Sequence, residues 1–239
     1  MKKVRQLAKG QPGLLGIVCL IAVLLTSCLK DNNDDVTLPP AALVSVINAS
    51  PGAQPVDFYL DQNKANTYSI AYGQDIDYIR AYTGKRTATF YAAGTQQKIK
   101  ADTTTLQADK FYTLYLTNIP SNPEFVLLRD SITRPAAGMA AIRFVNVSPD
   151  APAVDLAIKQ GNVLAANKGY KGYSPFISVQ GNNTYTLEIR QAGTATVLVT
   201  LADVKITSSS VYTVWLQGLS AATDATKLSA HIQTNAYYY

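Results

Sequence analysis

Chemically reactive side chains are scarce in this sequence of 239 residues, which has two cysteines, one histidine and one tryptophan. Cys19 and Cys28 both lie near the N-terminus, so the remainder has no thiol for a disulfide, a zinc site or nucleophilic catalysis. The single histidine, His231, lies close to the C-terminus with no triad partners around it. We therefore expect a protein that is not an enzyme and has no catalytic residues, metal or cofactor. A pair of carboxylates brought together by folding stays open as the one catalytic alternative.

An excess of positive charge is also missing once the N-terminal segment is set aside. Four of the 21 lysines and arginines lie within residues 1–27, which leaves 17 basic residues against 16 acidic ones. No cluster of basic residues exceeds the pair Lys85-Arg86. Binding to phosphate backbones depends on a basic surface, so nucleic acid is excluded as a favoured partner.

The N-terminal residues have the pattern of an export signal. Four basic residues precede an apolar run over residues 14–25, which is too short to cross a bilayer as a helix. Residues 25–28, Leu-Thr-Ser-Cys, follow this run and resemble the lipobox of bacterial lipoproteins. That resemblance implies cleavage before Cys28 and acylation of this cysteine, palmitate included, which would attach the protein to a membrane through a lipid.

A polar stretch follows the cysteine. Residues 30–35 read Lys-Asp-Asn-Asn-Asp-Asp, and Pro39 and Pro40 come soon after, so residues 28–42 predict a flexible tether. A lysine and aspartates behind a lipidated cysteine resemble the surface-export signal of Bacteroidota lipoproteins. The resemblance implies an outer-membrane protein displayed at the cell surface; the alternatives are a plain solvated linker and a location on the periplasmic face.

An internal repeat organises the rest of the chain. Residues 46–58, VINASPGAQPVDF, recur at a fixed offset of 98 as residues 144–156, FVNVSPDAPAVDL. Further matches follow in order to the end of each copy. The predicted organisation is a signal peptide (1–27), a lipidated tether (28–42), a first repeat (43–133), a linker (134–138), a second repeat (139–235) and a tail (236–239).

Apolar residues within each repeat alternate with a period of two. Tyr185, Leu187 and Ile189 point one way while the residues between them point the other, as in a half-buried strand. Turn residues recur every eight to twelve residues or so, a spacing typical of β-sandwiches. The prediction is an all-β protein with two tandem immunoglobulin-like antiparallel β-sandwich domains.

The repeated Asn-x-Ser-Pro motif is explained by turn chemistry. A strand would end at Asn48 or Asn146, Ser50 or Ser148 would bond turn backbone, and proline would fix φ. The alternative is that the aspartate that follows in each copy begins a calcium site. No spacing in the chain matches an EF-hand loop, which disfavours calcium.

The ordered motifs resemble a known family. The two Asn-x-Ser-Pro-x-Ala-x-x-Val-Asp segments, a glycine in mid-repeat and a closing Tyr-Thr strand are similar to the domain of unknown function 4397, a β-sandwich unit of bacterial surface and secreted proteins. The resemblance extends over residues 43–234. It implies a fold and a location but no activity, since the family has no established catalytic or ligand residues.

Tyrosine, with 15 residues, supplies most of the material for recognition. If Tyr112, Leu114 and Leu116 face the core, Tyr115 points outward, and Trp215 occupies the equivalent position of the second repeat. Our hypothesis is that Tyr115 and Trp215 stack on sugars. The alternative is that they cover the other repeat.

Further aromatic residues gather between predicted strands, where recognition residues of sandwich proteins often lie. They are Tyr68, Tyr72, Tyr78 and Tyr82 in the first repeat, and Tyr170, Tyr173 and Phe176 in the second. Of these, Tyr72 and Tyr170 match each other and are candidate ligand-binding residues. The sequence predicts a binding protein, with glycan or another envelope protein as the partner; the alternative is a structural spacer or protein scaffold.

Overall fold

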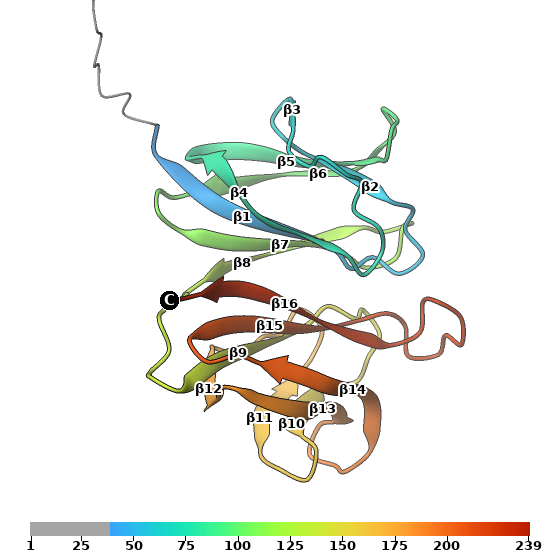
Figure 1. The fold of residues 1–239 in the computed structure, drawn as a ribbon. Helices are drawn as coiled ribbons and strands as arrows, with labels where there is room; N and C mark the ends of the chain where they lie inside the picture. The colour runs from blue at the N-terminus through green and yellow to red at the C-terminus, as the bar shows by residue number, and fades with distance from the viewer. Residues whose placement is uncertain (1–38) are drawn as a thin grey trace, which may run out of the picture. The chain divides into compact units, whose positions relative to one another are not determined.

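The computed structural model describes residues 39–239, which form one compact unit. The predicted signal peptide, the lipidation site Cys28 and most of the predicted tether lie outside the described residues. Within residues 39–239 the secondary structure is all β, with sixteen strands (Figure 1). This part of the chain contains no helix long and apolar enough to cross a membrane.

Each repeat contributes eight strands in the same order. Those of the first repeat are β1 (Ala41–Asn48), β2 (Val56–Leu60), β3 (Asn63–Lys64), β4 (Asp75–Tyr82), β5 (Gly84–Ala92), β6 (Lys98–Leu106), β7 (Phe111–Thr117) and β8 (Glu124–Asp130). Those of the second repeat are β9 (Met139–Asn146), β10 (Val154–Ile158), β11 (Val163–Lys168), β12 (Ile177–Gln180), β13 (Asn183–Gln191), β14 (Val197–Ile206), β15 (Ser210–Gln217) and β16 (Ser229–Tyr237).

The strands form four sheets, two in each repeat. The first repeat has the strand orders β4-β1-β7-β8 and β3-β2-β5-β6, and the second repeats both orders as β12-β9-β15-β16 and β11-β10-β13-β14. The predicted tandem β-sandwich is therefore confirmed. One detail differs from the purely antiparallel prediction, because β1 pairs in parallel with β7, and β9 in parallel with β15.

The alternation seen in the sequence fills the two sandwich cores. Tyr112, Leu114 and Leu116 of β7 are buried in the first core, beside Phe58 and Phe90 of the facing sheet. In the second repeat, the apolar side chains of β13 are likewise buried in the second sandwich core. Because side chains alternate across a strand, the opposite face of β7 and of β15 must be covered separately.

A third apolar cluster covers that opposite face by joining the two repeats. It consists of Ile47, Ala49, Tyr115, Val126, Leu128, Val145, Val147 and Trp215, all buried. These residues come from β1, β7, β8, β9 and β15 and the turns after β1 and β9, so the sheet β4-β1-β7-β8 packs on the sheet β12-β9-β15-β16 (Figure 1). We call this contact the inter-repeat interface.

A buried polar network lies within the same interface. Arg143 of β9 forms a salt bridge of 2.5 Å with Asp130 of β8, and the two side chains are 3% and 0% exposed. The Asp130 carboxylate also accepts hydrogen bonds from Tyr78 and Thr113, each at 2.7 Å. Arg143 donates in addition to the Thr213 hydroxyl. This network connects strands of both repeats.

The Asn-x-Ser-Pro motif acts as a turn, as the sequence predicts. β1 ends at Asn48 and β9 at Asn146, and each asparagine accepts a hydrogen bond from the backbone of the serine two residues later. Each serine hydroxyl donates to another loop, and that of Ser148 also accepts a hydrogen bond of 3.2 Å from the backbone N–H of Ala151 in its own turn. Ser50 donates to the carbonyl of Asn118 at 2.6 Å, and Ser148 to that of Gly218 at 2.7 Å.

The aspartate that follows the motif has a structural contact in both repeats. Asp57 accepts a hydrogen bond from the backbone N–H of Gly94, and Asp155 accepts one from that of Gly193, both at 2.9 Å. Each glycine has a positive φ in the turn of the next hairpin. The two aspartates thus fix equivalent turns and are not arranged as a calcium loop.

Candidate ligand-binding groove

The prediction that Tyr115 and Trp215 face solvent is wrong. Tyr115 is 0% exposed and Trp215 is 1% exposed. Both do lie on the face opposite the sandwich core, at equivalent positions, but that face is covered by the other repeat. Neither ring is available to a sugar or to a second protein, so the stated alternative, that they cover the other repeat, is correct.

Tyr72 and Tyr170 lie at the margins of the inter-repeat interface. Both are half-buried, and burial raises the pKa of each hydroxyl to about 12. The Tyr170 hydroxyl donates a hydrogen bond of 3.0 Å to Glu124 of the first repeat. The Tyr72 hydroxyl is buried close to Gln217 and Ser229 of the second repeat. The two tyrosines therefore make matching contacts across the interface.

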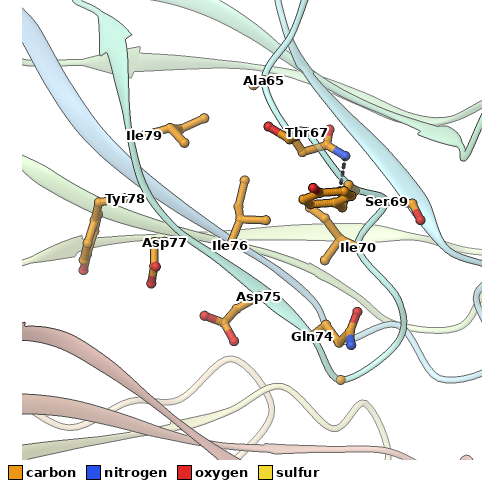
Figure 2. Close-up of a pocket in the computed structure, with 13 residues that line it drawn as sticks. Ala65, Thr67, Ser69, Ile70, Gln74, Asp75, Ile76, Asp77, Tyr78 and Ile79 are labelled. Carbon is orange, nitrogen blue, oxygen red and sulfur yellow. Dashed lines mark hydrogen bonds between the residues drawn. The ribbon is translucent and has the colours of Figure 1, made fainter.

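A large open groove lies in the first repeat. It measures about 680 Å³ and lies between the segment of residues 65–70 and the residues 73–79 that lead into and form the start of β4 (Figure 2). A ligand pocket typically holds about 300–1,000 Å³, so this groove has the size of a binding site. We call it the β4 groove.

Apolar residues form the floor of the β4 groove. Ile70 is buried, and Ile76 and Ile79 are partly buried and pack on the first core. Figure 2 shows Ile76 extending from β4 toward the opposite wall, whereas Asp75 and Asp77 project from the other side of the strand. The groove therefore has an apolar floor and polar margins, as binding sites commonly do.

An irregularity in β4 produces this arrangement. Ile76 pairs with Val46 and Ile79 with Val44, so β4 has one residue more than β1 between these two pairs. With the additional residue, Ile76 and Ile79 both face the core, although they are three positions apart. Asp75 and Tyr78 face the second repeat instead, where Tyr78 bonds to Asp130. Burial and the nearby Asp130 carboxylate raise the pKa of Tyr78.

Asn66 fixes the opposite wall of the groove. Its side chain is buried, accepts a hydrogen bond from the backbone of Phe58 at 2.7 Å and donates to the carbonyl of Tyr68 at 2.7 Å. The backbone of Tyr68 is thereby held to the sandwich while its ring is 84% exposed. Thr67 and Ser69 flank Tyr68 and also line the groove. The wall thus carries an aromatic ring and two hydroxyl groups on a fixed backbone.

The acidic margin of the groove has perturbed electrostatics. Asp75 is half-buried, and its pKa is raised by burial and by the neighbouring negative charge of Asp77. Asp77 is exposed, so its carboxylate can accept hydrogen bonds from the hydroxyl groups of a ligand. Residues 39–239 contain no group of three or more potential metal ligands.

The groove gives the tyrosines of the first repeat different roles. Tyr68 lines it and is largely exposed, Tyr78 lines it while bonding into the interface, and Tyr72 does not line it. The sequence places Tyr68 among four aromatics expected between strands, and nothing in it sets Tyr68 above Tyr72. Two of the four, Tyr78 and Tyr82, instead lie on β4. The flanking Thr67 and Ser69, both small and polar, are the local signal that favours an exposed ring at this position.

A family model matches part of the chain. Residues 42–157 match the model of the family described as domain of unknown function (DUF4397), which confirms the resemblance found in the sequence for that segment. The matched segment contains the first repeat and the first two strands of the second. No curated protein matches the chain.

Several solved structures are similar at low sequence identity. A family CBM26 carbohydrate-binding module from Eubacterium rectale Amy13K, in complex with maltoheptaose, is 12% identical, with 81% of this chain and 97% of that chain covered and a TM-score of 0.27. Family 41 carbohydrate-binding modules from streptococcal virulence factors are 11% identical (78% and 96% covered, TM-score 0.25). A putative cell adhesion protein from Parabacteroides distasonis is 8% identical (83% and 100%, TM-score 0.22). At these TM-scores the similarity says nothing about a ligand.

Proposed function

We propose that this protein, whose residues 42–157 match the DUF4397 family, is a non-catalytic, lipid-anchored surface protein that binds glycan in the β4 groove. The observation that supports glycan binding is the composition of the groove. A largely exposed tyrosine, Tyr68, lines the groove together with apolar residues and with hydroxyl, amide and carboxylate side chains. Sugars have the complementary surfaces, since their C–H faces pack on aromatic rings and their hydroxyls bond to polar side chains.

The edge of β4 disfavours an extended peptide as the ligand. A peptide would add to the sheet as another strand beside β4, which pairs with β1 and with no other strand within residues 39–239. Bulges and charged side chains are the features by which proteins block such pairing. β4 has the irregularity between Ile76 and Ile79 and carries Asp75, Asp77 and Arg80. A ligand that contacts the side chains of β4 therefore fits this edge better than a peptide that would pair with the backbone of β4.

Tyr68→Ala tests the glycan proposal. Because the ring is exposed and the backbone is held by Asn66, the variant should fold normally and lose the stacking surface. We expect binding of the retained glycan to weaken by about tenfold, as for an aromatic residue that contributes ~1–2 kcal/mol to binding. The measurement is retention on a glycan array followed by titration calorimetry, with thermal unfolding as the check on the fold.

Tyr173→Ala is the matched control. Tyr173 is an exposed tyrosine of the second repeat that does not line the β4 groove. Its replacement should leave glycan binding unchanged. Equal losses of glycan affinity in the two variants, or a Tyr68→Ala variant that binds glycan as tightly as the wild-type protein, would exclude the β4 groove as the binding site.

The location is a separate part of the proposal and has its own test. Cys28 in the Leu-Thr-Ser-Cys context and the acidic residues after it support a lipid anchor and surface display. Protease added to intact cells should then degrade the protein, and Cys28→Ala should abolish incorporation of labelled palmitate. Protection until lysis would indicate the periplasmic face, and palmitate labelling of Cys28→Ala would exclude this cysteine as the acylation site.

A further inference from the structure

The β4 groove continues past the part described above. A second cavity of about 300 Å³ lies along residues 79–82 of β4 and the β2–β3 hairpin. The two cavities share Ala65 and Ile79, so they form one furrow beside the exposed edge of β4. Strand residues advance about 3.3 Å each, so the furrow extends for roughly 20 Å along β4. It is long enough for a chain of several sugars.

The two ends of this furrow carry opposite charge. Asp75 and Asp77 lie at the first end. The charged residues at the second end are Asp61, Lys64, Arg80 and Arg86, three of them basic. Asp77 and Arg80 are three residues apart on β4, which is roughly 10 Å. A ligand in the furrow therefore meets negative charge at one end and positive charge at the other.

Existing ion pairs neutralise two of the three basic residues. Lys64 binds the Asp57 carboxylate at 2.8 Å, and Arg86 binds that of Asp61 at 3.1 Å. Arg86 also donates to the carbonyls of Tyr82 and Thr83, which holds the β4–β5 turn in place. Arg80 is exposed and forms no salt bridge with any residue of the described part of the chain.

We infer that the furrow binds an acidic oligosaccharide in one direction, with a carboxylate or sulfate of the sugar chain on Arg80 and a neutral sugar over Tyr68. The guanidinium group of arginine presents paired N–H donors that match a carboxylate or sulfate. Tyr82, which is 62% exposed beside Arg80, gives the acidic sugar an aromatic surface as well. Asp77, which is exposed at the other end, repels an anionic group there, and this sets the direction. This inference rests on the proposed glycan binding and adds the class of glycan.

The test compares acidic glycans with uncharged forms of the same backbone. The probes are oligogalacturonate with its methyl ester, and a sulfated glycosaminoglycan oligosaccharide with its desulfated and carboxyl-reduced form. The wild-type protein should bind the acidic member of a pair about fivefold more tightly, the upper end of what an exposed charge pair contributes. Added salt should reduce the preference.

Arg80→Gln should bring the affinity for the acidic member down to that for the uncharged member, whereas Tyr68→Ala should weaken binding of both members. Arg129→Gln is the matched control, since Arg129 is an exposed arginine of β8 outside the furrow and its loss changes the net charge equally. Equal affinity for both members of each bound pair, or an equal effect of Arg129→Gln, overturns the inference and leaves the proposed function standing. Binding of no glycan overturns both.

Discussion

At the scale of single residues, the interface between the repeats depends on a buried charge pair. Arg143 and Asp130 are removed from water, and each is satisfied by further hydrogen bonds, Arg143 to Thr213 and Asp130 to Tyr78 and Thr113. A buried pair adds little stability compared with apolar residues of the same shape, but loss of one partner leaves an unpaired charge in the interior. The pair therefore makes any other alignment of the two sheets costly.

Arg143→Ala should accordingly destabilise the protein strongly. The Asp130 carboxylate would stay buried without its cation, and we expect the free energy of unfolding to fall by ~3–5 kcal/mol. Urea denaturation followed by tryptophan fluorescence measures the loss, because Trp215 lies in the same interface.

A second arginine–carboxylate pair provides the control. Arg190 binds Glu188 at 2.6 Å within the outer sheet of the second repeat, and this pair is more exposed. Arg190→Ala should lower the free energy of unfolding less than Arg143→Ala does, by about 1–2 kcal/mol, because the Glu188 carboxylate keeps some access to water. Similar losses for the two variants would mean that burial of the Arg143–Asp130 pair has no special cost.

At the scale of strands and sheets, the sequence predicted the structure best where the alternation of apolar and polar residues determines which face of a strand is buried. The alternation of Tyr112, Leu114 and Leu116 predicts which face of β7 fills the sandwich core, and the structure agrees. Alternation does not say what covers the opposite face, because that depends on how two sheets far apart in sequence pack together. The prediction therefore placed Tyr115 on the correct face of β7 but wrongly expected that face to be exposed to solvent.

The β4 groove was beyond sequence reasoning for a related reason. Its walls are a loop and the edge strand β4. The space between them depends on the extra residue in β4 between Ile76 and Ile79. A single inserted residue leaves no periodic trace in a strand of eight residues. The cluster of tyrosines did indicate the right region. The ranking within it, Tyr68 above Tyr72, required the exposure of each ring.

At the scale of the whole molecule, the two sandwiches behave as one body because each covers a face of the other. The inter-repeat interface is a buried apolar cluster with the Arg143–Asp130 network beside it. Equivalent residues come from both repeats, as expected when two copies of one unit pack through the same sheet. Rigid coupling of this kind would hold the β4 groove of the first repeat in a constant orientation to the second.

Val145→Asp should uncouple the repeats without unfolding them. Val145 is fully buried in the interface but belongs to neither sandwich core, so a carboxylate there meets only the opposing sheet. A buried charge without a partner costs several kcal/mol, which separation of the repeats would relieve by hydration. We expect a larger radius of gyration in small-angle scattering and two urea transitions in place of one. Val163→Asp, at a 49% exposed position of β11, should change neither. If Val145→Asp keeps the wild-type radius and a single transition, packing between the repeats is not what couples them.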